Sequence, residues 1–368
     1  MSNSIRSSRQ RYAFAIPVLA VLLPAVVSLL LMEIALQTLF YFKNGYWLFT
    51  GQNRISVDYV KSVADRRQYS LKDGVFTDRY TINSRGFRGP EMSAHDSRPV
   101  ICILGDSTMF GWGVRDDETF PAFLQQDLND NGYRYFVLNA GVPSYNLRQS
   151  LDRWRLDIAP TYKCRVIVLN AANDVSLIDY YSPHWSPDLT WASQRFGIRV
   201  AQTSATIFFA RQAARHLGEL FEAHPKGVDD AVSTIAEDVI RGLEPVLAEG
   251  ARVVIAPVNG CFYWKYVDGD RDARACSGYA DYRQLADRWR PIIDKINIML
   301  RKVSRKEGVY YFDTVSDFDV VGREAAFIDF IHYSASGNKL LADKLFEVFV
   351  TEGYIRRPES AAQRDRSH

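Results

Sequence analysis

The stretch that decides the fold of this chain is Pro99-Val-Ile-Cys-Ile-Leu-Gly-Asp-Ser-Thr-Met-Phe-Gly-Trp-Gly113. Its apolar run, Val100 to Leu104, is short, unbroken and rich in β-branched residues, which predicts a strand buried on both faces. Gly105 breaks the run, and Ser107 then lies where a strand passes into a helix, at the sheet edge where ligands bind. We therefore predict that Ser107 is a nucleophile. The alternative, on the tripeptide alone, is an ordinary turn, because Gly, Asp and Ser are common turn residues.

Strands and helices alternate downstream of this stretch. Further short apolar runs predict strands at residues 135–138, 166–169, 252–258 and 309–312. Apolar residues at helical spacing predict helices at 118–129, 146–158, 235–247, 282–303 and 338–350. The alternation is typical of an α/β fold with a doubly wound, five-stranded parallel sheet and right-handed crossovers. We place this domain at residues 99–351, after an ordered lead-in at 43–98 and before a disordered tail at 352–368.

Two regions are longer than the crossovers need. Residues 175–229 form an insertion after the third predicted strand, and residues 260–279 follow the fourth. Both carry aromatic residues, and long loops at the carboxyl edge of a sheet tend to determine specificity. These aromatics either contact the substrate or pack a small core of their own. The candidates for substrate contact are Tyr180, Tyr181, Trp185 and Trp264.

The composition limits the classes of function. The formal net charge of +2 over 368 residues does not favour a nucleic-acid-binding protein, so no nucleic-acid partner is expected. The cysteines have no C-x-x-C pair and no metal-ligand spacing with histidine, so we expect neither a zinc site nor another cofactor. In an oxidising compartment Cys261 and Cys276 are placed to close a disulfide loop. Cys102, within the first strand, is expected to be a buried free cysteine.

The N-terminus contains a membrane-spanning pattern. Ala13 to Met32 is free of charge and long enough to cross a bilayer as a helix. Arginines precede this run and Glu33 follows it, which places the N-terminus in the cytoplasm. We predict that residues 1–42 are a cytoplasmic end and an uncleaved anchor in the inner membrane, with the catalytic domain on the periplasmic side. The alternative is a cleaved signal peptide, although no good small-x-small site follows the run.

A serine nucleophile needs a base and a group that orients the base. His332 lies immediately before the last predicted helix, and Asp329 precedes it by three residues. One tight turn would let the carboxylate reach the imidazole Nδ1 proton, and His332 would take the proton of Ser107. The alternative is a helix-capping aspartate beside a buried histidine.

Acyl transfer also needs hydrogen-bond donors for the developing oxyanion. Three are expected at this sheet edge: the Ser107 amide, an amide in the turn after the second strand, and the Asn173 side chain after the third strand. Each follows a strand of the same parallel sheet, so the three donors are expected to converge.

With these residues the chain resembles the SGNH hydrolases, or GDSL lipase/esterase family, over roughly residues 99–350. The resemblance is carried in order by Gly105-Asp106-Ser107, Asn139-Ala-Gly-Val-Pro-Ser144, Ala171-Ala-Asn173-Asp174 and Asp329-Phe-Ile-His332. Two positions depart from the family pattern, since Ser144 and Ala171 stand where glycine is usual. The first adds a side chain beside the substrate, and the second affects the shape of its loop.

The resemblance implies a flavodoxin-like SGNH fold and a role for each matched residue. Ser107 would be the nucleophile, His332 the base and Asp329 the orienting carboxylate. The oxyanion would be bound by the amides of Ser107 and Ser144 and by the Asn173 side chain.

The sequence is compatible with three functions. The first is a serine esterase that hydrolyses O-acyl esters, O-acetyl above all, on an envelope or extracellular glycan or lipid. The second uses the same triad to move an acetyl group onto a surface polysaccharide, within an envelope polysaccharide-modification assembly that the resemblance implies. The third is an inactive domain that binds glycan or serves as a scaffold.

Overall fold

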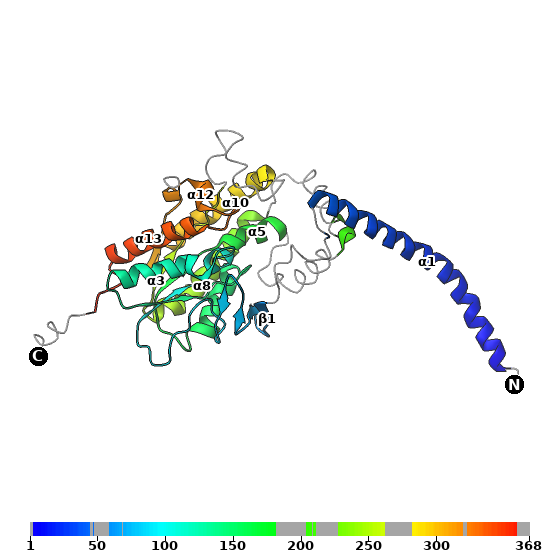
Figure 1. Cartoon of the computed structure of the whole chain (residues 1–368), viewed down its shortest axis with the longest axis horizontal. Coiled ribbons are helices and arrows are strands. Elements are labelled where there is room, and N and C mark those ends of the chain that lie inside the picture. Colours follow the sequence, from blue (N-terminus) through cyan, green and yellow to red (C-terminus); the bar gives the residue numbers. More distant parts are fainter. Residues whose placement is uncertain are drawn as a thin grey trace, which may run out of the picture. The chain divides into compact units, whose positions relative to one another are not determined.

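The computed structural model describes residues 3–44, 47, 59–67, 69–181, 204–207, 209–210, 227–261, 282–318 and 322–358. The chain forms two compact units. One comprises Met1–Val57 with Thr190–His224, and the other comprises Asp58–Leu189 with Pro225–His368 (Figure 1). The larger unit contains the sheet and all residues of the predicted site.

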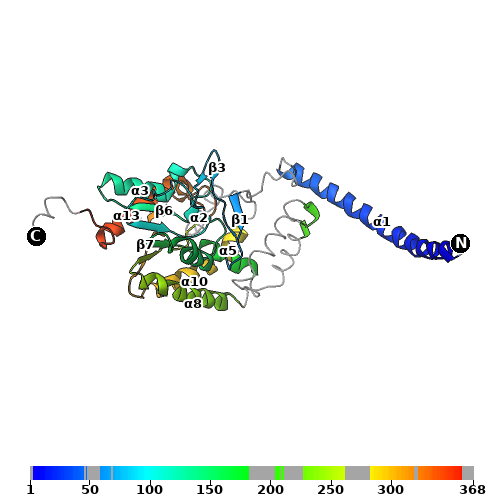
Figure 2. The same cartoon turned by 90° about the horizontal axis from the view of Figure 1, so that it is seen from below.

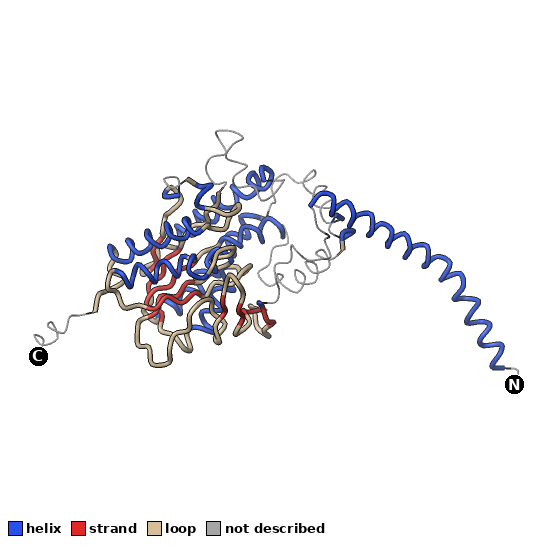
Figure 3. The backbone as a smooth tube through the Cα atoms, in the orientation of Figure 1, coloured by secondary structure: helices blue, strands red, loops and turns tan. Residues whose placement is uncertain are grey.

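The sheet of the larger unit is parallel and five-stranded, as the sequence predicts. Its strands are β5 (Val100–Ile103), β6 (Phe136–Asn139), β7 (Cys164–Leu169), β8 (Arg252–Ile255) and β9 (Val309–Tyr311). Their order is β6-β5-β7-β8-β9, with every neighbouring pair parallel. Figure 3 shows the strands in red, with helices in blue beside them. Strand β5, between β6 and β7, is buried along its whole length, which explains its unbroken apolar sequence. Because β6 and β7 lie on opposite sides of β5, the chain reverses direction across the sheet, where an open α/β sheet forms its ligand crevice.

Helices cover both faces of the sheet. On one face, α3 (Phe120–Asp130) packs against α13 (Ala335–Thr351). On the other, α8 (Val228–Ala248) packs between α4 (Leu147–Arg153) and α10 (Tyr282–Val303), and α10 also contacts α5 (Ala172–Tyr181). Figure 2 shows β6 and β7 between these two helical layers. The shorter helical segments are α2 (Ser107–Phe110), η3 (Asp116–Glu118), the π-helical turn η4 (Trp154–Ile158) and α12 (Arg323–Ala326).

The lead-in contains short strands that its sequence does not indicate. β1 (Val60–Ser62) pairs with β2 (Tyr69–Leu71), and β3 (Val75–Phe76) pairs with β4 (Thr81–Ile82), both antiparallel. Strands of two or three residues are too short to show a period of two in hydrophobicity, so the sequence pattern does not reveal them. A single bridge between Arg88 and Asn139 then joins the lead-in to the end of β6.

One prediction about the cysteines is wrong. Cys102 is not free: it forms a disulfide with Cys164. The two residues lie on the adjacent strands β5 and β7 with their Cα atoms 5.8 Å apart, within the range that a disulfide spans. This adjacency of the first and third strands of the sheet follows from the strand order. Cys261 is also disulfide-bonded, whereas its expected partner Cys276 lies outside the described residues.

The smaller unit contains the long helix α1 (Asn3–Asn44). Its segment Leu22–Phe42 is long and apolar enough to cross a membrane, as a membrane anchor or a signal sequence would. In the C-terminal third of this helix, the Glu33 carboxylate accepts hydrogen bonds from the amides of Ala205 and Thr206. Phe40 packs there against Ala205.

Candidate active site

The predicted nucleophile begins a helix at the carboxyl end of β5. Asp106 caps α2, accepting a hydrogen bond of 2.8 Å from the amide of Thr108, and Ser107 is the first helical residue. The preceding Gly105 has a φ of +151°, and a Cβ atom there would lie 2.2 Å from Oδ1 of Asn170. Only glycine fits this turn, which directs the chain from the strand into the helix.

The structure brings Ser107, His332 and Asp329 into one hydrogen-bonded chain. His332 Nε2 lies 2.8 Å from Ser107 Oγ, and His332 Nδ1 lies 2.7 Å from Asp329 Oδ2. The other oxygen of Asp329 accepts the amides of Ile331 (2.9 Å) and His332 (2.8 Å). The three-residue spacing seen in the sequence is therefore a closed turn in which one carboxylate holds both the backbone and the ring of the histidine.

The Asp329 carboxyl group is ionised in this turn. Burial raises its pKa, but the hydrogen bonds and the charge interaction with His332 outweigh burial, so the pKa lies below its ordinary value. An ionised Asp329 accepts a proton-bearing Nδ1, which leaves Nε2 of His332 free to accept the proton of Ser107.

The expected oxyanion donors are joined to one another and to the nucleophile turn. The Asn173 side chain donates from Nδ2 to the carbonyl of Ser144 (2.7 Å), and Ser176 donates to Asn173 Oδ1 (2.8 Å). The amide of Asn173 donates to Asp106 Oδ2 (2.6 Å). Since a carboxamide has two N–H groups, Asn173 keeps a second donor for a substrate oxygen.

Ser144 adopts the backbone conformation that glycine usually supplies. Its φ is +66°, which makes it the one residue other than glycine with positive φ in the part of the chain that the structure describes. A left-handed conformation is costly for a residue with a Cβ atom, so the departure from the family pattern leaves the turn shape intact at a cost in strain. Ala171, at the other departure, is buried.

Three buried groups around the site were not predicted from the sequence as functional. Gly141 packs so closely on α2 that a Cβ atom would lie 2.4 Å from the amide nitrogen of Phe110. Asp174 is buried and accepts the amide of Leu147 (2.9 Å); burial raises its pKa to about 8. Arg88, from the lead-in, hydrogen-bonds to the loop after α2. The glycine at position 141 is the one sequence signal for the close approach of this segment to α2.

The aromatic candidates for substrate contact stay a prediction. Tyr180 and Tyr181 end α5, and both Trp185 and Trp264 lie outside the described residues. A different aromatic residue lies beside the base: the ring of Trp112 is 6.4 Å from that of His332, centre to centre. In the described ranges no group of three or more His, Cys, Asp and Glu side chains is arranged to hold a metal ion.

Comparisons with known proteins give one family match and several similar solved structures. Residues 103–340 match the model of the GDSL-like lipase/acylhydrolase family. Similar solved structures include a lipase/acylhydrolase from Enterococcus faecalis, at 15% identity over 71% of this chain and 100% of that one, with a TM-score of 0.44. A member of the lipolytic G-D-S-L family from Veillonella parvula matches at 14% identity (69% and 99% covered, TM-score 0.40). An acetyl xylan esterase matches at 16% identity (68% and 98% covered, TM-score 0.38). A comparison with curated proteins found no match.

Proposed function

This chain belongs to the GDSL-like lipase/acylhydrolase family, and we propose that it is a serine esterase that acts through Ser107, His332 and Asp329. The observation that carries the proposal is the continuous chain of hydrogen bonds, 2.8 Å from Ser107 to His332 and 2.7 Å from His332 to Asp329. Distances in this range are those expected between a nucleophile, its base and the group that orients the base.

The reaction proceeds in two halves. In the first, His332 takes the proton of Ser107 as its Oγ attacks the ester carbonyl, and the imidazolium then gives this proton to the departing alcohol. In the second, His332 takes a proton from water, which attacks the acyl-enzyme. The carboxylic acid leaves as the Ser107 oxygen regains a proton. Asp329 stays ionised and stabilises the imidazolium in both halves.

The negative charge on the carbonyl oxygen is stabilised by amide donors. We assign the backbone N–H groups of Ser107 and Ser144 and the free N–H of Asn173 to this role. The hydrogen bond from Asn173 to the Ser144 carbonyl supports the assignment, because it fixes two of these donors relative to each other. Removing one such donor typically costs about 2.7–4 kcal/mol of transition-state stabilisation.

The substrate that we propose is an O-acyl ester, O-acetyl above all, on a glycan or lipid of the cell envelope or its exterior. An apolar helix at the N-terminus supports a membrane location, with the site on the periplasmic side of the inner membrane. The Cys102–Cys164 disulfide supports the same side, because disulfides persist in oxidising compartments. The third function considered from the sequence, an inactive binding domain, is disfavoured by the intact triad.

Hydrolysis of p-nitrophenyl acetate by the full chain in detergent tests the nucleophile. Ser107→Ala is expected to lower kcat by about 10⁴-fold or more and to leave the melting temperature unchanged. Ser304→Ala is a matched control, since this serine directly follows α10 and its hydroxyl donates to the nearby carbonyl of Arg301. Activity retained in Ser107→Ala would refute the assignment.

Transfer to a sugar hydroxyl in place of water is resolved by product analysis. Mass spectrometry would follow the acyl-enzyme and its products with and without a glycan acceptor. We expect free carboxylic acid under both conditions, as hydrolysis requires. Acylated glycan as the main product would replace the esterase proposal by an O-acyltransferase acting in a polysaccharide-modification assembly.

A further inference from the structure

Arg88 is a buried cation beside the nucleophile turn. Its side chain is 2% exposed and its guanidinium lies over the ring of Phe110, at 4.6 Å from the ring centre. The residue comes from the lead-in, not from the sheet domain predicted from sequence. A buried arginine is costly unless each of its donors is used, so its partners show what it holds in place.

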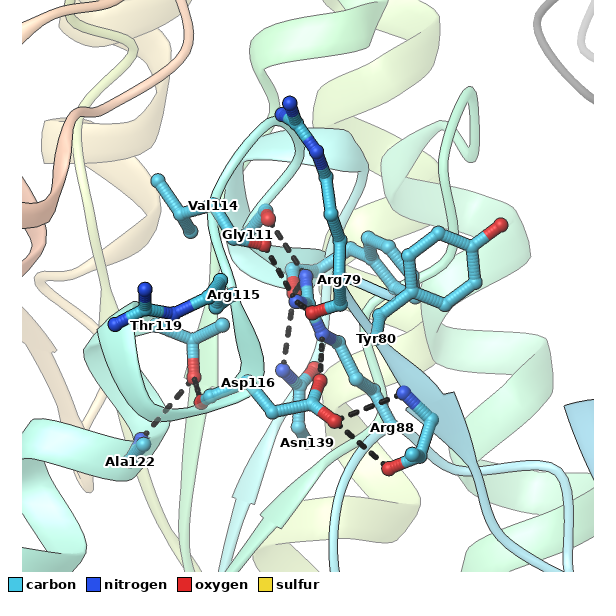
Figure 4. Close-up of polar contacts among 12 residues, drawn as sticks. Arg79, Tyr80, Arg88, Gly111, Val114, Arg115, Asp116, Thr119, Ala122 and Asn139 are labelled. Atoms are coloured by element: carbon cyan, nitrogen blue, oxygen red, sulfur yellow. Dashed lines mark hydrogen bonds and ion pairs between the residues drawn. The ribbon is translucent and has the colours of Figure 1, made fainter. Parts of the chain in front are cut away.

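The guanidinium of Arg88 binds one loop, which comprises residues 110–116, and also donates to the carbonyl of Arg79 in the lead-in (3.4 Å). Nε donates to Asp116 Oδ1 (2.8 Å), and the terminal nitrogens donate to backbone carbonyls (Figure 4). These carbonyls belong to Phe110 (3.0 Å), Gly111 (2.6 Å) and Val114 (2.8 Å). The second oxygen of Asp116 accepts the amide and hydroxyl of Thr81, both at 2.8 Å. One planar cation thus connects both ends of the loop to the lead-in.

The loop that Arg88 holds is the continuation of the nucleophile helix. The amides of Gly111 and Trp112 both donate to the carbonyl of Ser107, at 3.1 and 2.9 Å. The same loop places the Trp112 ring beside His332. A shift of this loop therefore moves the nucleophile and a neighbour of the base together.

The backbone of Arg88 reaches a second part of the site. Its amide donates to the carbonyl of Asn139 (3.2 Å), at the end of β6. Asn139 in turn donates from Nδ2 to the Phe110 carbonyl (3.1 Å) and accepts the amide of Gly141 (3.2 Å). The turn that ends at Ser144 begins here, so Arg88 connects the nucleophile segment to a segment that carries an oxyanion donor.

We propose that Arg88 is a positioning residue, which holds the loop 110–116 so that Ser107 lies in line with His332 and the oxyanion donors. The inference rests on the esterase function proposed above. It assigns a role in the chemical step to a lead-in residue that does not touch substrate. Its predicted signature is a loss in kcat with little change in KM. The clamp, meaning the hydrogen bonds from Arg88 to residues 110–116, acts on the alignment of Ser107 and not on substrate binding.

Arg88→Lys is the variant that tests the clamp. Lysine keeps the positive charge, but its single nitrogen cannot span Asp116 and the carbonyls on both sides of the loop. Arg67→Lys is the matched control: Arg67 is also buried, but its ion-pair partners, Asp65 and Asp157, lie outside the loop 110–116. Each variant is measured as the full chain, well below its melting temperature, with active sites titrated by a fluorophosphonate.

We expect Arg88→Lys to lower kcat for p-nitrophenyl acetate by about 10- to 100-fold, with KM changed by less than about threefold. The rate constant for fluorophosphonate labelling should fall in parallel, and Arg67→Lys should keep the wild-type values. Hydrogen exchange, which needs no activity, should be faster in Arg88→Lys for peptides covering residues 107–116. Wild-type kcat with unchanged exchange in Arg88→Lys would overturn the inference. Absence of labelling in the wild type would instead refute Ser107 as the nucleophile.

If Arg88→Lys does not fold, Asp116→Asn tests the same clamp with a smaller change in the structure. This change removes the ion pair with Arg88 but keeps an oxygen for the Thr81 amide. A fall in kcat with unchanged KM supports the clamp, and wild-type kcat together with unchanged exchange at residues 107–116 contradicts it.

Discussion

The two halves of the proposed triad are held in place by different means. His332 and Asp329 lie in one turn, and the Asp329 carboxylate makes its hydrogen bonds within that turn. The position of Ser107 depends on distant segments. Asn170 packs on Gly105, and the amide of Asn173 donates to Asp106, which caps the helix of Ser107. Arg88 binds the loop that follows this helix. The base turn is a local structure and the nucleophile turn a tertiary one. Changes in the first are therefore expected to alter chemistry alone, whereas changes in the distant segments that support the second also alter stability.

The largest effect is expected from breaking the base turn at Asp329. Asp329→Asn keeps an oxygen for the amides of Ile331 and His332 but turns an N–H towards the ring, which favours the wrong tautomer. We expect kcat to fall by about 10⁴-fold with a melting temperature close to that of the wild type. Steady-state kinetics and thermal unfolding check this, and a large loss of stability would show that the turn is not self-contained.

A smaller loss of activity is expected on the nucleophile side from Asn173→Ala. The change removes an oxyanion donor and also the hydrogen bond to the Ser144 carbonyl. We expect kcat to fall by about 10²- to 10³-fold. In contrast to Asp329→Asn, this variant should also unfold at a lower denaturant concentration. The lost hydrogen bond should lower its free energy of unfolding by about 1 kcal/mol. Equal stability of the two variants would contradict the comparison.

The pH dependence of stability sharpens the contrast, because the nucleophile side contains a buried acid. The folded-state pKa of Asp174, raised to about 8, lies above the unfolded value of about 3.9. Its contribution to stability is therefore fully present below about pH 4 and is lost as the pH rises towards 8.

Asp174→Asn should remove this pH dependence. Relative to the wild type, the free energy of unfolding should gain on the order of 1 kcal/mol per pH unit between pH 5 and 8. Urea unfolding at several pH values measures it, with Asp230→Asn in the exposed first turn of α8 as the control. Parallel stability curves for Asp174→Asn and the wild type would show that Asp174 ionises freely in the folded protein.

The smallest effect is expected at Ser144. Ser144→Gly relieves a φ of +66° but adds freedom to the unfolded chain, so we expect a gain of about 0.5–1 kcal/mol in the free energy of unfolding. The backbone N–H remains, so kcat should change by less than about twofold. A large change in kcat would mean that the serine side chain, and not only its amide, takes part in the reaction.

The local and the tertiary parts of the site differ in how far the sequence predicts them. The alternation of strands and helices, the five strands and Ser107 are local patterns, and the Asp329–His332 spacing encodes a turn that closes on itself. The support of Ser107 is not local. Arg88 lies in a segment without periodicity, and its partners follow it by more than twenty residues. The Cys102–Cys164 pair depends on strand order, which periodicity does not encode.

The disulfide between Cys102 and Cys164 makes a covalent ring of the chain between them. The ring spans a sequence separation of 62 residues and contains both Ser107 and Ser144. In the chain-entropy model, closing a ring of this size stabilises the fold by about 4 kcal/mol. A protease cut at any one bond within the ring would leave Ser107 covalently joined to both cysteines, to one through the peptide chain and to the other through the disulfide. Ser107, the proposed nucleophile, is thus tethered by the peptide chain and by the disulfide, in the part of the fold where its position depends most on distant contacts.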